Sequence, residues 1–216
     1  MSGARRPIST IHPRRVPATY AFLGILLVMY GLQLLIAGRL SMDAAYTVVP
    51  RPPSIEYFLL TPWVHSSHLH VLENLTLFGI FGWWTERQLG TDSFVVVVLV
   101  AGYLTNLLPS VIGIGGLGVG LSGVTNMLAG YVTVKQLWLL SKGGLFEANI
   151  PWTLLWCAVS FFLGLIIVVH SIAEFTGLID PATGIATGVH FVGVMLGFAV
   201  AIVTLRNVTG RGVLDG

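Results

Sequence analysis

Six stretches of this chain are apolar and close to the roughly 20 residues that a helix needs to cross a bilayer. Of the 216 residues, 55% are hydrophobic and 9% are charged, whereas an average soluble domain has about 25% charged residues. A water-soluble fold of this size could not hide so much apolar surface. We therefore predict an all-α membrane protein with six transmembrane helices, over Ala18–Ala37, His68–Thr85, Phe94–Ile112, Gly120–Trp138, Trp152–His170 and Gly184–Leu205.

The basic residues indicate how these spans are oriented. If the amino terminus is inside, only Arg39 and Arg51 lie on the outer side, and the other Lys and Arg residues lie on the inner side. An excess of Lys and Arg marks the cytoplasmic side. The inner set is Arg5, Arg6, Arg14, Arg15, Arg87, Lys135, Lys142, Arg206 and Arg211. We therefore predict two cytoplasmic termini, with a basic tail over 1–17, one six-helix domain over 18–205 and a second tail over 206–216.

The loops and the net charge give little indication of the function. The long outer loop Gly38–Ser67 is expected to hold short interfacial helices. The net charge of +2 does not indicate a nucleic-acid partner. A G-x-G-x-x-G pattern over Gly113–Gly118 lies between two predicted spans rather than in a strand–helix–strand unit, so it does not predict a dinucleotide cofactor.

Polar side chains recur at one depth of the predicted membrane. The second, fourth and sixth spans all descend from the outer side, and their first turns carry His70, Asn74, Ser122 and His190. At ~1.5 Å per residue, these positions lie within roughly 10 Å of the outer boundary. Because polar groups inside a membrane are costly, their convergence indicates a functional site.

A serine and a histidine in this set suit nucleophilic catalysis. A serine hydroxyl is a weak nucleophile unless a neighbouring base takes its proton. Two histidines, His170 and His190, could reach Ser122 from the outer side. His190 is favoured because it shares a helical face with small residues, which let two helices approach closely. That face comprises Ala186, His190, Gly193 and Gly197, and if it meets the fourth span, Ser122 and His190 are within hydrogen-bond distance.

The second span offers hydrogen-bond donors. His70 and Asn74 are four residues apart, so they share a helical face. Acyl transfer creates a negatively charged oxygen that positioned donors must receive, and the backbone N–H of Ser122 at a helix start is a further donor. On their own, His70 and Asn74 could equally well serve as contacts between helices.

These residues together resemble the rhomboid family of intramembrane serine proteases. The resemblance rests on H-x-x-x-x-H-x-x-x-N (His65, His70, Asn74), on Phe81–Gly82 and Leu89–Gly90, on G-x-S-G (Gly120, Ser122, Gly123) and on H-x-x-G-x-x-x-G (His190, Gly193, Gly197). It implies a Ser122–His190 catalytic dyad, with His70, Asn74 and the Ser122 N–H stabilising the oxyanion. It also implies that the substrates are transmembrane proteins with helix-destabilising segments and a small residue before the cut, and that no cofactor is needed.

Some positions depart from the family pattern. Many members have an aromatic ring four residues after the nucleophile, where this chain has Asn126, which could bond His190 or tie two helices together. Glu73, one turn from His70, could tune that histidine or make a structural hydrogen bond. No acidic third residue is evident beside the dyad. His65, His68, His70 and Glu73 lack a zinc-binding spacing, so no metal is predicted.

Two other functions remain open at this stage. The first is a catalytically inactive rhomboid-like protein that binds membrane clients. The second is a small transporter, although the chain shows no inverted repeat and no polar line through the inner half of the membrane. A single six-helix unit suggests a multi-pass protein of a prokaryotic plasma membrane.

Overall fold

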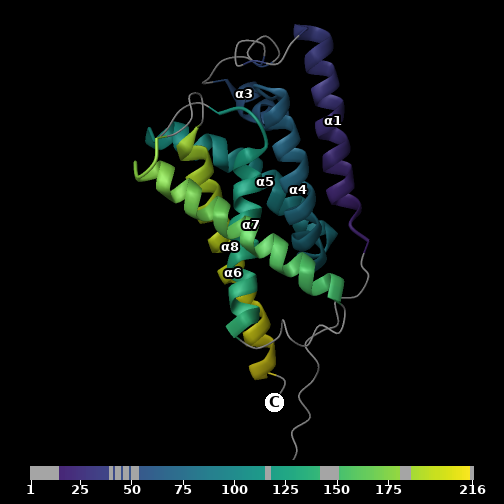
Figure 1. Ribbon diagram of the computed structural model, residues 1–216, viewed down its shortest axis with the longest axis vertical. Coiled ribbons are helices and arrows are strands. Elements are labelled where there is room, and N and C mark those ends of the chain that lie inside the picture. Colours follow the sequence, from purple (N-terminus) through teal and green to yellow (C-terminus); the bar gives the residue numbers. More distant parts are fainter. Residues whose placement is uncertain are drawn as a thin grey trace, which may run out of the picture.

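The computed structural model describes residues 15–38, 54–114, 118–141, 151–180 and 186–214, with Ser41, Ala45 and Val49. Within these ranges every regular element is helical (Figure 1). The helices are α1 (Pro17–Ala37), α3 (Ile55–Leu60), α4 (His68–Leu89), α5 (Thr91–Ile112), α6 (Ser122–Ser141), α7 (Pro151–Phe175) and α8 (Thr187–Leu214), and η1 (Thr61–Trp63) is a 3-10 helix. Residues 1–14, most of 39–53 (including Arg39 and Arg51) and the loop 142–150 lie outside the described residues.

Helix α6 is the centre of the bundle. It packs against α4, α5, α7 and α8, and residues 123–133 of it are all buried. Helix α1 lies at the edge of the bundle (Figure 1), where it packs mainly against α4. The start of α6 is therefore surrounded by side chains from several other helices.

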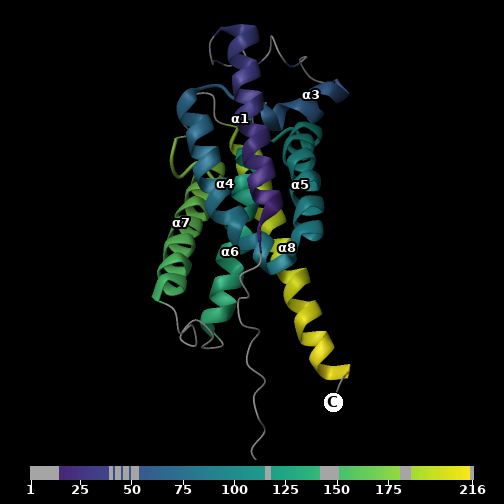
Figure 2. The same ribbon diagram turned by 90° about the vertical axis from the view of Figure 1, so that its right-hand side faces the viewer.

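The long helices alternate in direction. Helix α1 runs toward the end of the molecule at which α4, α6 and α8 begin, and these three helices then run back toward the end marked C (Figure 2). The first turns of α4, α6 and α8 are thus close together. The two short helices α3 and η1 lie at this same end, in the loop that leads into α4.

Four described helices are long and apolar enough to cross a membrane: Pro17–Ala37, Thr91–Ile112, Leu155–Phe175 and Thr187–Leu205. Helices α4 and α6, which are also predicted spans, do not reach the same hydropathy. Helix α6 can carry polar residues because its surroundings are protein rather than lipid. The chain is therefore a multi-pass membrane protein.

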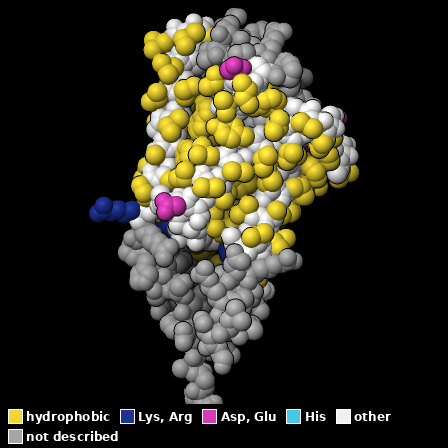
Figure 3. Space-filling model, turned by 180° about the vertical axis from the view of Figure 1, so that it is seen from behind, with side chains coloured by type: hydrophobic (Ala, Val, Ile, Leu, Met, Phe, Trp, Pro, Cys, Tyr) yellow, Lys and Arg dark blue, Asp and Glu magenta, His cyan; other side chains and the backbone are white. Residues whose placement is uncertain are grey.

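The outer surface of the bundle is apolar. The face in Figure 3 is covered largely by hydrophobic side chains, and the charged side chains on its described part lie near the two ends. Strongly exposed apolar residues include Leu35, Val28 and Leu27 on α1 and Val111 on α5. In water such a surface would drive aggregation, so it fits a lipid environment.

Several helices end beyond the predicted boundaries. Helix α4 continues to Leu89, α7 to Phe175, and α8 to Leu214, where the sequence predicted a tail from residue 206. Hydropathy marks where the apolar stretch ends, whereas a helix can continue into water because its hydrogen bonds are internal. Glycines do mark two ends, since Gly38 and Gly113 have φ of 67° and 72° and cap α1 and α5.

A buried carboxylate joins α1 to α4 at the end of the bundle opposite to the start of α6. Glu86 is 1% exposed and accepts hydrogen bonds from the backbone N–H groups of Ala18 (3.1 Å) and Thr19 (2.7 Å) and from the hydroxyls of Thr19 (2.7 Å) and Thr91 (2.9 Å). The first N–H groups of a helix have no partner within the helix, and a negative charge there is favourable. Glu86 therefore fixes the start of α1 against α4.

We expect Glu86→Gln to destabilise the protein by about 1–3 kcal/mol, the range for losing hydrogen bonds to a buried charged group. An amide has a single acceptor oxygen, and its NH2 group would face N–H groups that need acceptors. Thermal denaturation in detergent would measure the loss. Glu73→Gln is the control because the Glu73 side chain is exposed, and an equal shift for both variants would contradict this role of Glu86.

Candidate active site

Ser122 is the first residue of α6, and the loop before it is held in place from two sides. The backbone N–H of Gly120 donates to the carbonyl of Thr61 (2.7 Å), and the Tyr57 hydroxyl donates to the carbonyl of Gly118 (3.0 Å). Gly120 has φ of +102°, and a Cβ atom there would lie 2.7 Å from Cε1 of His70. A glycine is therefore required at position 120 both for its backbone conformation and for space.

The hydroxyl of Ser122 contacts the imidazole of His190. The distance from Ser122 Oγ to His190 Nε2 is 3.1 Å, and the His190 side chain is 19% exposed. His170 is the competing histidine, but its side chain is 58% exposed and it contacts Glu174 instead. Of the two histidines, the structure thus brings His190 to the serine.

Helices α6 and α8 pack closely enough for the side chains of Ser122 and His190 to make this contact. Gly193 lies against the carbonyl oxygen of Gly123, and Gly197 lies against the carbonyl oxygen of Met127. Any side chain at either glycine would collide with the backbone of α6. The small residues on the His190 face of α8 therefore let the two helix backbones touch, one and two turns below the dyad.

His70 and Asn74 lie on α4 near the start of α6. The Nδ1 atom of His70 is 3.2 Å from the hydroxyl of Ser66, while its Nε2 faces Gly120, where a Cβ atom would be 2.9 Å away. If the Ser66 hydroxyl donates to Nδ1, the ring carries its own proton on Nε2. His70 can then present an N–H group toward the loop that carries Ser122.

The amide of Asn74 has a buried donor without a partner. Its Oδ1 is 3.2 Å from the hydroxyl of Thr125, and its Nδ2 is buried and has no hydrogen bond in the described part of the chain. Unpaired buried donors are rare because each one costs free energy. A donor kept free beside a nucleophile is what an oxyanion site requires.

His65 supports this region from the loop before α4. Its backbone N–H donates to Gln33 Oε1 (2.9 Å) and its carbonyl accepts from Gln33 Nε2 (2.7 Å). Its ring is fully buried and lies edge-on to His70, with 5.1 Å between ring centroids. Burial, together with the nearby His70, lowers the pKa of His65 to about 3, so His65 stays neutral at physiological pH.

The histidines and Glu73 at the start of α4 do not converge on one point. His68 contacts the Tyr30 hydroxyl (3.0 Å) and His70 contacts Ser66, while Glu73 is exposed. Among the described residues, no three His, Cys, Asp or Glu side chains are grouped so that they could hold a metal ion.

Asn126 links helices α6 and α7. Its Nδ2 donates to the carbonyl of Ser122 (2.8 Å), and its Oδ1 accepts from the Ser171 hydroxyl of α7 (2.6 Å). Of the two roles considered for Asn126, the described contacts correspond to the link between helices. Ser171 thereby fixes the end of α7 beside the dyad.

An acidic residue that the sequence did not single out lies beside His190. Glu174 is buried near the end of α7, and its Oε2 lies 3.8 Å from Nδ1 of His190. The expectation that no acidic residue lies near the dyad is therefore corrected. The predicted span ended at His170, so the His170-x-x-x-Glu174 spacing, which puts both side chains on one helical face, was the available signal. Gln33 and Thr125 were also missed, because their partners, the backbone of His65 and the amide of Asn74, are far from them in the sequence.

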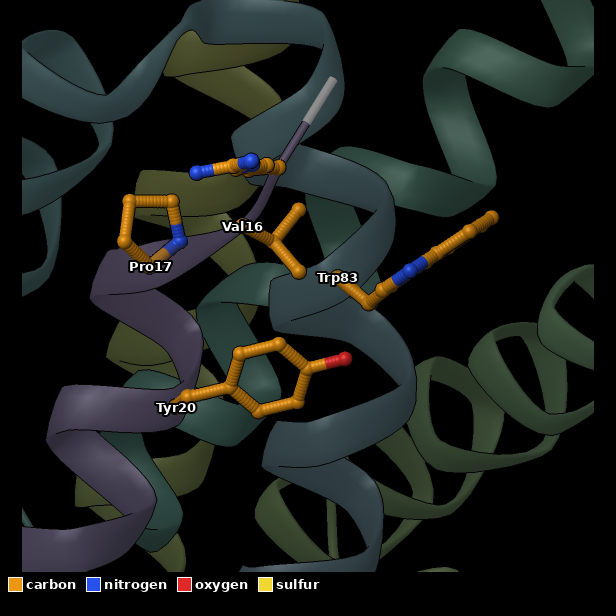
Figure 4. A pocket seen from close by; sticks show the side chains of 5 residues that line it. Val16, Pro17, Tyr20 and Trp83 are labelled. Carbon is orange, nitrogen blue, oxygen red and sulfur yellow. The ribbon is translucent and has the colours of Figure 1, made fainter. Parts of the chain in front are cut away.

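A surface pocket at the start of α1 is separate from these residues. It is lined by Arg15, Val16, Pro17, Tyr20 and Trp83, with the Tyr20 and Trp83 rings lying on neighbouring helices (Figure 4). None of the candidate catalytic side chains lines it. The pocket is therefore not part of the candidate active site.

Comparison with known proteins gives a consistent family assignment. The rhomboid domain model matches residues 54–207, which include every candidate site residue. The rhomboid protease GlpG of Salmonella paratyphi A is 25% identical over 213 residues, covering 94% of this chain and 69% of that protein. GlpG of Photorhabdus laumondii is 30% identical over 134 residues, covering 59% of this chain and 47% of that protein. The resemblance inferred from the motifs is confirmed, and this chain belongs to the rhomboid family.

Proposed function

We propose that this protein is an intramembrane serine endopeptidase that cuts peptide bonds in or near the transmembrane segments of other membrane proteins. The single observation that carries the proposal is the 3.1 Å contact between Ser122 Oγ and His190 Nε2. A half-buried serine and histidine on two closely packed helices form the minimum pair for nucleophilic catalysis. The distant similarity to rhomboid proteases adds support.

The first half of the reaction forms an acyl-enzyme. Ser122 Oγ attacks the peptide carbonyl carbon while its proton passes to His190 Nε2, and the carbonyl π electrons move onto oxygen. The tetrahedral intermediate then collapses, the C–N bond breaks, and His190 returns the proton to the leaving amine. In the second half, water gives a proton to His190 Nε2 as its oxygen attacks the ester carbon. The second tetrahedral intermediate collapses, the bond from the carbonyl carbon to Ser122 Oγ breaks, and His190 returns the proton to Ser122 Oγ as the carboxyl product leaves.

We assign three donors to the oxyanion. Asn74 contributes its unpaired Nδ2 group, His70 contributes a ring N–H, and Ser122 contributes its backbone N–H at the start of α6. Gly120 and Gly123 support the site by close packing, because His70 lies against Gly120 and the side chains of Thr105 and Val189 lie against Gly123. Because these donors are fixed by the fold, the negative charge can be stabilised without reorganisation during the reaction. The reaction needs no cofactor.

The alternating directions of the long helices support a placement in the membrane. We assign α1, α4, α5, α6, α7 and α8 as six spans with both termini in the cytoplasm, so the dyad lies near the outer surface. The described basic residues support this orientation, because they lie toward the helix ends that are far from the dyad. Arg15 precedes α1, Arg87 lies near the end of α4, and Lys135 lies in the second half of α6. The bacterial relatives support a prokaryotic plasma membrane.

The proposed substrates are single-pass or other transmembrane proteins. A substrate helix that is weak near its outer end exposes its peptide bonds there.

A serine-directed fluorophosphonate and a model transmembrane substrate test the proposal together. Purified protein in proteoliposomes is expected to be labelled and to cut the substrate, and mass spectrometry would place the cut near the outer end of its transmembrane segment. Ser122→Ala and His190→Ala are expected to abolish both signals, whereas His170→Ala retains Ser122 and His190 and is expected to keep labelling.

The opposite result would identify a different function. If the wild-type protein is neither labelled nor active while Ser122→Ala still binds the substrate with equal affinity, the chain is a rhomboid-like protein that binds membrane clients without cutting them. Cleavage that persists in Ser122→Ala would also contradict the proposal.

A further inference from the structure

Two ionisable side chains in the last two turns of α7, Glu174 and His170, extend the chain of contacts that begins with Ser122 and His190. Glu174 Oε2 lies 3.8 Å from His190 Nδ1, and Glu174 Oε1 lies 3.2 Å from His170 Nε2. The other ring nitrogen of His190 faces Ser122 Oγ at 3.1 Å. The order Ser122, His190, Glu174, His170 therefore runs from the nucleophile to the exposed side of α7.

The carboxyl of Glu174 is short of partners on the side that faces His190. Its side chain is 2% exposed, and Oε2 is buried without a hydrogen bond among the described residues. A buried carboxylate oxygen without a donor is costly. The ring Nδ1 of His190, 3.8 Å away, can supply the N–H group that this oxygen lacks.

Two independent contacts hold Glu174 beside His190. The ring of Phe175 stacks on Phe191 of α8, with 3.9 Å between centroids and 5° between planes. On the other side, Ser171 bonds Asn126 of α6 at 2.6 Å. The residues flanking Glu174 are thus fixed to both helices of the dyad, so the distance from Glu174 to His190 is set by the fold rather than by a free side chain.

We infer that Glu174 is a positioning residue for the catalytic base, so that the site works as a Ser122–His190–Glu174 triad; this rests on the proposed function. The carboxylate accepts Nδ1–H of His190 and so keeps the proton on Nδ1. The lone pair of Nε2 then faces the Ser122 hydroxyl, which is the tautomer that a general base needs.

The carboxylate also acts during the reaction. When Nε2 takes the Ser122 proton, His190 becomes an imidazolium and Glu174 provides the opposite charge, while no proton moves to Glu174 itself. His170 Nε2–H donates to the other carboxylate oxygen, at 3.2 Å, and so holds the carboxylate in place. In unliganded enzymes catalytic hydrogen bonds are often long and tighten only in the complex, and a 3.8 Å separation is compatible with this behaviour.

Glu174→Gln separates this role from a purely structural one. The amide is nearly isosteric but neutral, so we expect kcat to fall about 10²-fold, within the range for general acid–base catalysis, with little change in KM. The acidic limb of the kcat/KM profile is expected to move to lower pH, because the neutral amide no longer stabilises protonated His190. The other titratable groups near His190, which are His70 on α4 and His170 on α7, are unchanged in this variant.

Two further variants complete the comparison. Glu174→Asp keeps the charge, so its acidic limb is expected to stay at the wild-type pH although kcat falls. Glu73→Gln removes an exposed carboxyl from α4 and is expected to leave both kcat and the limb unchanged. A Glu174→Gln enzyme with the wild-type kcat and limb, beside an inactive Ser122→Ala enzyme, would overturn the triad while leaving the protease intact.

A measurement on the unaltered protein covers the case in which Glu174→Gln does not fold. Nitrogen NMR of ¹⁵N-histidine-labelled protein distinguishes the two ring tautomers, and the His190 signals are identified by their loss in His190→Gln. The triad predicts a proton on Nδ1 at neutral pH, and a proton on Nε2 would overturn it. Loss of cleavage in the wild type, by contrast, would count against the proposed function itself.

Discussion

Gly197→Ala is expected to force α6 and α8 apart and to destabilise the protein by about 3 kcal/mol, the upper end of the range for overpacking. A Cβ atom at this position would collide with the carbonyl oxygen of Met127 and would lie 2.8 Å from the backbone N of Tyr131. Backbone atoms cannot rotate away as a side chain can, so the helices must separate. His190 lies two turns above on α8, and cleavage should fall together with the midpoint of thermal denaturation.

Gly24→Ala is the matched control for this change. Gly24 also lies within a long apolar helix, but no described atom beyond its chain neighbours and the nearby backbone of its own helix lies within 4 Å of the position that its Cβ would occupy. Because alanine favours a helix over glycine by roughly 1 kcal/mol, this variant should be as stable as the wild type or more stable. If Gly197→Ala retained both the wild-type melting midpoint and full cleavage, the close packing of α6 on α8 would not be what holds the dyad together.

The convergence of the dyad could be predicted because it depends on properties that the sequence displays. Apolar stretches predicted the number and direction of the long helices, so Ser122 and His190 were expected near the same end of the bundle. The spacing of Gly193 and Gly197 below His190 then indicated which face of the last helix meets its neighbour. Neither inference needed the exact tilt of a helix.

Glu174 could not be placed in this way. The apolar stretch of its helix was predicted to end at His170, whereas α7 continues to Phe175, so Glu174 was left in a loop. Its approach to His190 depends on the crossing of α7 over α6 and α8, which is set by contacts such as Phe175 with Phe191. For the same reason the contact of Glu86 with the start of α1 was not predictable.

Asn74→Ala is expected to lower kcat by about 10²–10³-fold, the effect of removing one oxyanion donor. The Nδ2 group of Asn74 is buried and unpaired, so in the resting protein the donor contributes little to stability and is free to bond the oxyanion. KM should change little because the bond forms fully only in the transition state. Cleavage of a model transmembrane substrate at saturation would measure kcat.

Thr125→Val and Asn106→Ala show whether a loss of kcat in Asn74→Ala comes from the missing hydrogen-bond donor or from a disturbed fold. Thr125 contacts Asn74 Oδ1 at 3.2 Å, so its removal lets the amide turn and should cost less than Asn74→Ala. Asn106 is also buried, but its Nδ2 bonds the Gly102 carbonyl of its own helix (3.1 Å), and its loss should leave kcat within about twofold. A kcat defect in Asn106→Ala as large as in Asn74→Ala, at equal stability, would mean that Asn74 is a contact between helices rather than an oxyanion donor.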